Sequence, residues 1–197
     1  ALTAQVAEAE QQLAEAATRL TEARTAAAAG LSRAVEDELA HLGMDKARVE
    51  VAVEPRGEES ALEVTSADGT TRRVGPDGAD VVEVRVAANR GAPPRSVAKA
   101  ASGGELSRIM LAIEVATAGS TGSQVPTFVF DEVDAGVGGR AALDVGARLA
   151  ALARTSQVIV VTHLAQVAAH ADRHLVVHKA HGDQVTASGV RPVEGET

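Results

Sequence analysis

Thr127-Phe128-Val129-Phe130-Asp131-Glu132 is a run of apolar, β-favouring residues that ends in two carboxylates. Pro126 opens the run, and a Gly-rich turn over residues 134–139 follows it. A run that is apolar on both faces is typical of a strand in the middle of a sheet covered on both sides. Acids at its carboxyl end then lie at the sheet edge where open α/β folds bind ligands. One such carboxylate can hold a divalent metal and the next can activate a water, although a plain strand before an acidic turn has the same sequence.

The composition excludes several classes of protein. The chain has 197 residues, a net charge of −8, no Cys, no Trp or Tyr, and two Phe. Without Cys it has neither disulfides nor thiolate metal sites, and without more aromatic residues it offers no base-stacking platform for single-stranded nucleic acid. Its acidic balance argues against strong non-specific nucleic-acid binding by the chain alone. No segment has the length and apolarity of a membrane span, so we expect no membrane partner.

The first 29 residues are predicted to form a coiled-coil helix. They contain no Pro or Gly, and apolar residues recur in steps of four and three, which is a heptad seam. The seam consists of Leu2, Val6, Ala9, Leu13, Ala16, Leu20, Ala23 and Ala27. Gly30 is expected to interrupt the helix, which resumes over residues 31–42 and ends at Gly43.

Residues 30–197 are expected to form one lobe, in which residues 31–99 hold a helix and a small antiparallel sheet. Residues 48–54 and 81–88 alternate apolar and polar residues, and residues 61–65 form a shorter strand. Gly75-Pro76-Asp77-Gly78 is a turn signal. We therefore predict strands connected as a meander, followed by a loop over residues 89–94.

From residue 100 onward the pattern predicts an α/β arrangement. An apolar helix over residues 109–118 precedes the opening strand, and a helix over residues 140–154 with Ala142, Val145, Leu149 and Leu152 on one face follows it. Residues 157–162 predict a second buried parallel strand that ends at His163. A short helix over residues 164–171 and a hairpin turned at residues 181–183 complete the chain.

Ser102-Gly103-Gly104-Glu105 stands where the helix of this α/β part begins. Ser102 is a good N-cap and Glu105, three residues later, completes a capping box. Two glycines let a ligand approach the backbone, and a helix N-terminus attracts anions. An ordinary capped helix has the same features.

The ordered set of these motifs resembles the carboxyl-terminal half of an ABC-type ATPase head. Within that class, Glu105 and the coiled coil that leads into the head resemble SMC-like proteins. Residues 97–112, 130–139 and 161–168 closely resemble the RecN family of bacterial DNA-repair proteins. The resemblance implies an α/β fold: the carboxyl-terminal lobe of an SMC-like ATPase head, with a small antiparallel β part and an amino-terminal coiled-coil helix.

The resemblance also implies a role for each motif residue, with ATP and Mg²⁺ as cofactors. Asp131 would hold Mg²⁺ through a bound water. Glu132 would activate the attacking water, and His163 would contact the γ-phosphate. The signature residues, Ser102, Gly103, Gly104 and Glu105, would bind ATP held by a second head, and Asp134 would link the two sites across the dimer. The expected output is ATP hydrolysis in the repair of DNA double-strand breaks, in the bacterial cytoplasm or nucleoid.

One departure limits what this chain can do alone. A Walker A motif needs Gly-Lys-Ser/Thr, and the three lysines, Lys46, Lys99 and Lys179, do not follow a glycine. We therefore expect an inactive carboxyl-terminal piece whose partners are the amino-terminal half with Walker A, a second head as a homodimer, and DNA. Another SMC-like or ABC-type head, or a mainly architectural DNA tether that uses ATP to join heads, stays open as an alternative.

Overall fold

The computed structural model describes residues 2–57, 62–66, 69–99, 103–118, 126–181 and 186–193. The chain divides into two compact units, one of residues 1–40 and 44–102 and the other of residues 41–43 and 103–197. The first unit combines a long helix with antiparallel strands, and the second is an α/β unit. The division of residues 1–29 from residues 30–197 stays a prediction about the complete protein.

Helix α1, Leu2–His41, is continuous, so the expected interruption at Gly30 is wrong. One Gly costs a helix only about 0.5–1 kcal/mol relative to Ala. Burial of Val35 and Leu39, which are 1% and 0% exposed, outweighs that cost in the following turns. The predicted end at Gly43 is confirmed: Gly43 has a φ of 75°, and the Met44 N–H donates to the Leu39 carbonyl at 2.9 Å. This is the bond of a Schellman cap.

The heptad seam of α1 is not the face that the helix buries. The buried residues of α1 are Ala14, Ala17, Val35 and Leu39. On the seam, Leu2 is 75%, Val6 49% and Leu20 38% exposed. The seam residue Leu13 is partly buried against the apolar cluster of this unit, so the seam is open at Leu2 and Val6 rather than along its whole length, and the coiled coil stays a prediction.

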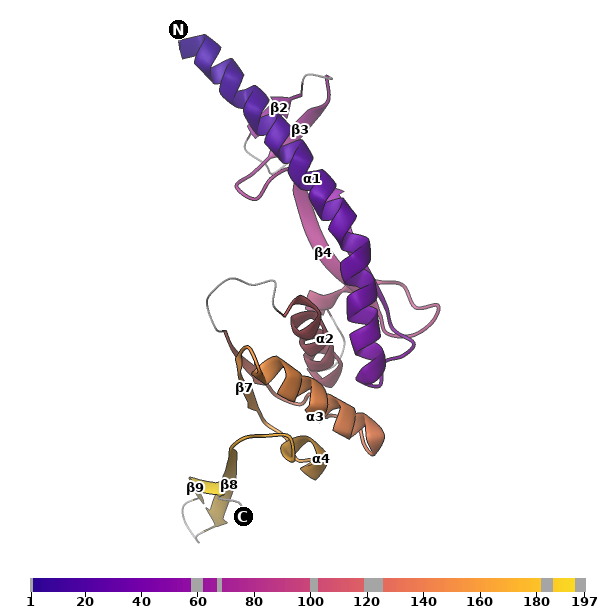
Figure 1. Ribbon diagram of the computed structural model, residues 1–197, viewed down its shortest axis with the longest axis vertical. Helices are drawn as coiled ribbons and strands as arrows, with labels where there is room; N and C mark the ends of the chain where they lie inside the picture. Colours follow the sequence, from indigo (N-terminus) through magenta and orange to yellow (C-terminus); the bar gives the residue numbers. More distant parts are fainter. Residues whose placement is uncertain are drawn as a thin grey trace. The chain divides into compact units, whose positions relative to one another are not determined.

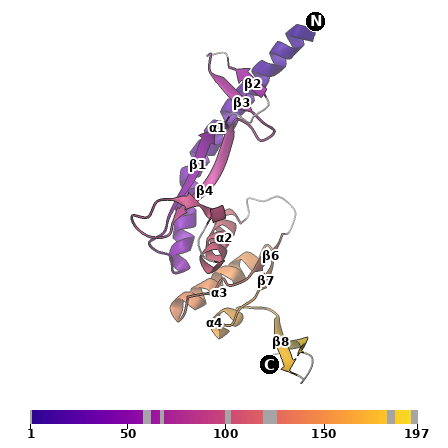
Figure 2. The same cartoon turned by 180° about the vertical axis from the view of Figure 1, so that it is seen from behind.

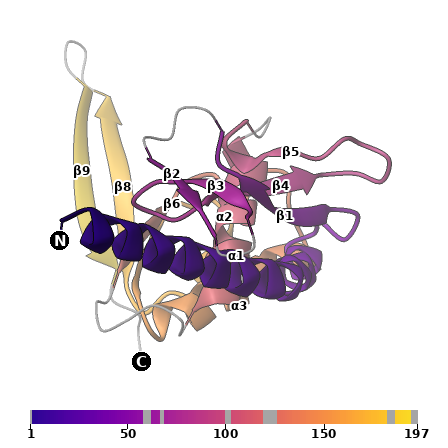
Figure 3. The ribbon, with the colours of Figure 1, turned by 90° about the horizontal axis from the view of Figure 1, so that it is seen from above.

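The strands of the first unit form two separate antiparallel sheets. Strand β1, Arg48–Pro55, pairs with β4, Asp80–Ala87, which also pairs with the short β5, Arg95–Ser96. Strand β2, Leu62–Thr65, pairs with β3, Thr71–Val74, and a 3₁₀ turn, η1, covers Val97–Lys99. In Figures 1 and 2 α1 runs beside β4 and the β2–β3 pair, and Figure 3 shows these strands on one side of the helix.

The meander prediction is wrong in one respect, because β1 pairs with β4 rather than with β2. The β2–β3 pair satisfies its own hydrogen bonds and leaves β1 free to meet β4. Strand β3 was missed because Thr71-Arg72-Arg73-Val74 has two adjacent charges and no clear alternation. The predicted turn at residues 75–78 is confirmed by two backbone hydrogen bonds between Gly75 and Gly78, at 3.0 and 3.1 Å.

Side chains of α1 cover the outer edge of β1. Glu36 Oε1 accepts a hydrogen bond from the Val49 N–H at 2.8 Å, and Ser32 Oγ accepts one from the Val51 N–H at 3.1 Å. β1 is an edge strand, with β4 on its other side. The helix therefore satisfies backbone donors that an uncovered edge would present to another chain.

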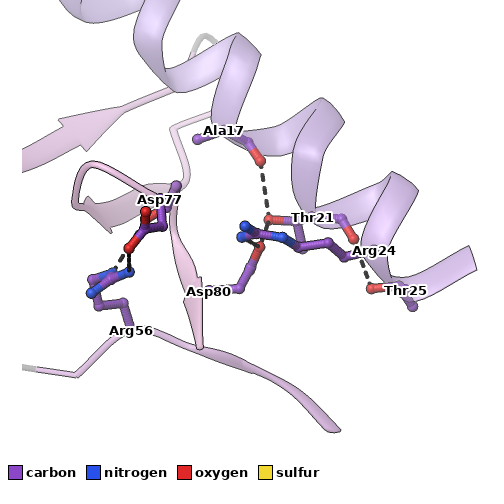
Figure 4. Close-up of polar contacts among 8 residues, drawn as sticks. Ala17, Thr21, Arg24, Thr25, Arg56, Asp77 and Asp80 are labelled. Atoms are coloured by element: carbon purple, nitrogen blue, oxygen red, sulfur yellow. Dashed lines mark hydrogen bonds and ion pairs between the residues drawn. The ribbon is translucent and has the colours of Figure 1, made fainter. Parts of the chain in front are cut away.

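A buried carboxylate joins α1 to the start of β4 (Figure 4). Asp80 is 5% exposed. Its two oxygens accept hydrogen bonds from Thr21 Oγ1 at 2.8 and 2.9 Å, and Arg24 Nη1 lies 3.3 Å from Oδ2. Because a buried charge is costly without partners, this pairing defines how the helix lies on the strand. Next to it, Ala14, Ala17, Val64, Val74 and Ala79 form an apolar cluster.

The second unit begins with α2, Gly103–Thr117, and continues with β6, Thr127–Phe130, and α3, Arg140–Ala153. Strand β7, Gln157–Val160, α4, Ala165–Ala168, and the antiparallel pair β8, His174–His181, and β9, Thr186–Val193, follow. The predicted parallel pairing of β6 with β7 is confirmed. In Figure 2 α2 and α3 lie beside this pair. The predicted face of α3 is also confirmed, since Ala142, Val145, Leu149 and Leu152 are all buried.

The expected burial of both faces of β6 and β7 is wrong for the described chain. Phe130 is 5% exposed, whereas Val129 is 66% and Ile159 48% exposed on the other face. Val161, just after β7, is 58% exposed. The β6–β7 pair therefore has one covered and one open apolar face. Among the described residues, every helix is too short or too polar to cross a bilayer.

Candidate functional site

The two acids that end the opening stretch lie directly after β6. Asp131 and Glu132 are both exposed. Glu132 is the one non-glycine residue of the described chain with a positive φ, 57°. Such a backbone conformation is uncommon for a residue with a side chain, and it is found more often at functional sites. It turns the chain sharply, so that the following residues, Val133 and Asp134, are buried.

The start of α2 lies against this turn. A Cβ on Gly103 would lie 2.6 Å from Glu132 Oε2, and a Cβ on Gly104 would lie 2.8 Å from the Ala135 Cβ and 3.1 Å from the Glu132 carbonyl oxygen. At Gly104, which meets the Ala135 Cβ and backbone, only glycine permits so close an approach, whereas at Gly103 the Glu132 side chain could turn aside. The structure therefore brings two of the predicted motifs, the glycines of α2 and the acids after β6, to one place. Glu105 follows in the first turn of α2, and Ser102 lies outside the described residues.

A second cluster forms where β7 ends. The Val161 N–H donates to the Phe130 carbonyl at 2.9 Å, which carries the parallel pairing one residue beyond β7. Asp134 is 2% exposed and accepts hydrogen bonds from the Thr162 hydroxyl and from the His163 N–H at 3.2 Å. His163 Nδ1 lies 3.3 Å from the same carboxylate, while the His163 side chain is 75% exposed. Asp134 thus holds one side of an exposed imidazole, and the opposite nitrogen, Nε2, is left for a ligand.

The electrostatics of Asp134 agree with this arrangement. Burial raises the pKa of the carboxyl. The hydrogen bonds from Thr162 and from the His163 backbone lower that pKa, and together with the other interactions they outweigh the effect of burial, so the pKa lies below its ordinary value. The Asp134 carboxylate therefore has its hydrogen-bond partners, Thr162 and His163, within the same chain. Its expected role across a head dimer stays a prediction, and the described contacts support the positioning of His163.

Three contributors to the site were missed from the sequence. Ser107 Oγ donates to the Asp131 carbonyl at 2.7 Å, and Arg108 Nη1 donates to the Ala135 carbonyl at 2.7 Å. The third, Thr162, was assigned only to a strand end. Arg108 could have been noticed, because it directly precedes the apolar run Ile109-Met110-Leu111-Ala112. A charged residue beside the apolar face of a helix is a candidate for burial.

This site could hold Mg²⁺ only if other groups share in binding the ion. Asp131 and Glu132 offer exposed carboxylate oxygens, the hard donors that Mg²⁺ prefers. Within the described residues no three His, Asp or Glu side chains gather into a metal site. Since Mg²⁺ is commonly held by one or two carboxylates together with substrate phosphates, Asp131 fits as one ligand of an ion whose other ligands come from elsewhere.

Comparisons with known proteins give a consistent relationship. No family model matches the chain. It is 55% identical over 174 residues to the DNA repair protein RecN of Streptomyces coelicolor, which covers 88% of this chain and 30% of that protein. It is 50% identical over 197 residues to the DNA repair protein RecN of Mycobacterium leprae, covering 98% of this chain and 33% of the relative. The chain thus spans about a third of the length of these curated relatives.

A solved structure agrees in fold. The Smc head domain with a coiled coil and joint from Pyrococcus yayanosii matches 83% of this chain and 26% of its own, with a TM-score of 0.52 and 20% identity. At that identity the match supports the fold alone, an SMC-type head. Together with the sequence identity over nearly the whole chain, these findings place the chain in the RecN family of DNA repair proteins.

Proposed function

We propose that this chain is the carboxyl-terminal lobe of an SMC-like ATPase head that acts in the repair of DNA double-strand breaks. The observation that carries the proposal is the meeting of α2, the β6 acids and the Asp134–His163 pair in one unit. A Cβ on Gly103 would lie 2.6 Å from Glu132 Oε2, and His163 Nδ1 lies 3.3 Å from Asp134. The names of the relatives add DNA repair as the process.

The glycines of α2 would receive the phosphates of ATP bound to a second head. The first backbone N–H groups of a helix have no partner within the helix, and the helix dipole favours an anion there. Gly103 is exposed at this end of α2, and the absence of side chains lets phosphate oxygens reach the backbone. Ser102 would add its hydroxyl, so that ATP joins the two heads.

The acids after β6 would act on ATP bound to their own head. Asp131 would hold Mg²⁺ through a water molecule, and the ion would neutralise charge on the phosphates. Glu132 would orient the attacking water and accept its proton. The exposure of Glu132 supports this role, because its carboxylate is accessible to a bound ligand, and its unusual backbone conformation is of the kind found at functional sites.

His163 would contact the γ-phosphate through Nε2. The contact of Nδ1 with Asp134 Oδ2, at 3.3 Å, favours an orientation of the imidazole in which Nε2 faces away from Asp134. A held imidazole costs less entropy to align than a free one. Loss of the γ-phosphate after hydrolysis would remove this contact together with the contact to α2, and the heads would separate.

The rest of the protein would cover the open apolar surfaces. The chain lacks a Gly-Lys-Ser/Thr motif and spans about a third of its relatives, so we propose that the remaining part supplies Walker A and packs on the open face of β6 and β7. The heptad seam of α1 would take the partner strand of the coiled coil. We further propose that the assembled homodimer binds DNA in the bacterial cytoplasm.

Replacement of Glu132 by Gln in the complete protein tests the catalytic proposal. The amide keeps the shape of the side chain but cannot accept a proton, so turnover should fall by about 10²-fold or more while ATP-dependent association of heads persists. Turnover is measured by phosphate release and association by light scattering. Hydrolysis at the wild-type rate would rule out this role for Glu132.

Replacement of Ser102 by Arg tests binding in trans. The arginine side chain, which is larger than serine and positively charged, would block the approach of a second head, so ATP-dependent association should be lost. Unchanged association would count against the role of the α2 start. If the complete protein binds ATP and bridges DNA without any DNA-stimulated turnover, the architectural function replaces the enzymatic one.

A further inference from the structure

The start of α2 and the turn after β6 are tied by side chains that the proposed chemistry does not use. Ser107 Oγ donates to the Asp131 carbonyl at 2.7 Å. Arg108 Nη1 donates to the Ala135 carbonyl at 2.7 Å and lies 3.5 Å from the Val133 carbonyl. These two adjacent residues of α2 thus reach both ends of the turn that contains Glu132.

Arg108 is placed at a cost to stability. It is 8% exposed, and its Nε has no hydrogen-bond partner in the described structure. Burial lowers the pKa of the guanidinium, and the nearby charge of Glu105 opposes that shift. A buried cation usually pairs with a carboxylate, whereas Arg108 donates to main-chain carbonyls of the turn. Its rigid set of donors suits it to hold a backbone in one shape.

Close packing makes the connection stiff. A Cβ on Gly104 would lie 2.8 Å from the Ala135 Cβ, so the first turn of α2 rests directly on the turn after β6. The contact of Gly104 with Ala135, together with the hydrogen bonds from Ser107 and Arg108, leaves little room for α2 to move without the turn after β6. A shift of the α2 start therefore moves the backbone that carries Asp131 and Glu132.

We infer that Ser107 and Arg108 are positioning residues that couple the α2 start, where ATP of the partner head binds, to the carboxylates that act on ATP of their own head. The inference rests on the proposed function and extends it, because it gives a route by which one ATP site reports its occupancy to the other. Neither side chain touches ATP in this scheme. Each acts through the main chain of the turn.

The test uses the complete protein, with residues numbered as here, and the variants Ser107→Ala and Arg108→Met. Two readouts are needed: kcat and KM for ATP from phosphate release, and ATP-dependent association of heads by light scattering in a Glu132→Gln background. Both variants should lower kcat about tenfold, which corresponds to roughly 1.4 kcal/mol in the barrier. KM and association should stay within about twofold of wild type, because the contacts to ATP are intact.

Matched controls separate positioning from general damage. Thr117→Ala removes a hydroxyl from the same helix, where it donates only to carbonyls of that helix, and it should leave kcat unchanged. Arg108→Lys retains one donor and should restore part of the loss of Arg108→Met. Far-UV circular dichroism checks folding, and if Arg108→Met does not fold, Ser107→Ala and Ser107→Thr carry the test.

The outcomes are distinct. An unchanged kcat in Ser107→Ala and in every folded Arg108 variant would overturn the inference, and so would a loss of kcat that occurs only together with a loss of association. If wild type does not hydrolyse ATP, or Glu132→Gln hydrolyses it normally, the proposed function fails and the inference falls with it. A tenfold loss of kcat with association intact, in variants that fold, supports both.

Discussion

Replacement of Asp80 by Ala should destabilise the first unit more than any exposed charge does. Asp80 is 5% exposed and accepts hydrogen bonds from Thr21 Oγ1 at 2.8 and 2.9 Å, with Arg24 Nη1 at 3.3 Å (Figure 4). Removal of the carboxylate deletes the polar link between α1 and β4. The arrangement of these donors determines how large the loss is.

Two features limit the loss. Thr21 Oγ1 also lies 3.0 Å from the Ala17 carbonyl, so its hydroxyl keeps a partner. The Arg24 side chain is 26% exposed and can turn toward water. The cost should therefore fall below the 3–5 kcal/mol typical of breaking a fully buried pair, at about 2–4 kcal/mol. For a chain of this size that is a fall in Tm of about 5–15 °C. Asp80→Asn, which keeps the acceptor oxygen, should cost about half as much.

Urea unfolding followed by far-UV circular dichroism measures the change, since the chain has no Trp or Tyr for intrinsic fluorescence. Asp77→Ala is the matched control. Its carboxylate is 81% exposed and lies 3.9 Å from Arg56, so its loss should cost less than about 0.5 kcal/mol. Equal effects of Asp80→Ala and Asp77→Ala would refute the argument that the buried carboxylate anchors α1.

Three further predictions follow from single contacts. Leu39→Ala, at a side chain that is 0% exposed, should cost about 2–5 kcal/mol in urea unfolding. Ser32→Ala removes the acceptor 3.1 Å from the Val51 N–H and should cost about 1 kcal/mol, with faster hydrogen exchange at that amide. Asp134 has a pKa below its ordinary value of 3.8, so its contribution to stability is present above pH 3.8 and is lost as the pH falls through the lowered pKa. The difference in urea stability between wild type and Asp134→Asn should therefore vanish at the acid end, and a constant difference at every pH would contradict it.

The elements of the second unit could be predicted because each depends on local pattern. The four apolar positions of α3 recur at helical spacing, and all four are buried. The parallel pairing of β6 with β7 followed from two apolar runs separated by a helix. The contacts within the site could not be predicted in the same way. The bonds from Ser107 to Asp131 and from Arg108 to Ala135 join residues 24 and 27 positions apart, and no spacing rule relates them.

The errors in the first unit have a different physical cause, which is competition between local and long-range terms. Gly30 disfavours a helix locally, but burial of Val35 and Leu39 beyond it keeps α1 continuous. The strand order failed because the alternation of β1 and β4 predicts strands without naming partners. Because β2 pairs with β3, β1 is left to pair with β4.

The two errors in predicted burial have the same direction. The sequence predicts burial for the heptad seam of α1 and for both faces of β6, and the described chain leaves the seam residue Leu2 75% exposed and Val129 66% exposed. The same kind of pattern is reliable in α3, whose predicted face is fully buried, whereas in α1 the off-seam residues Ala14 and Ala17 are buried. Exposed apolar surfaces of this extent mark sites of interaction. The excess of predicted over observed burial therefore supports a complete head in which the seam and the open face of β6 and β7 are covered by the part of the protein outside this chain.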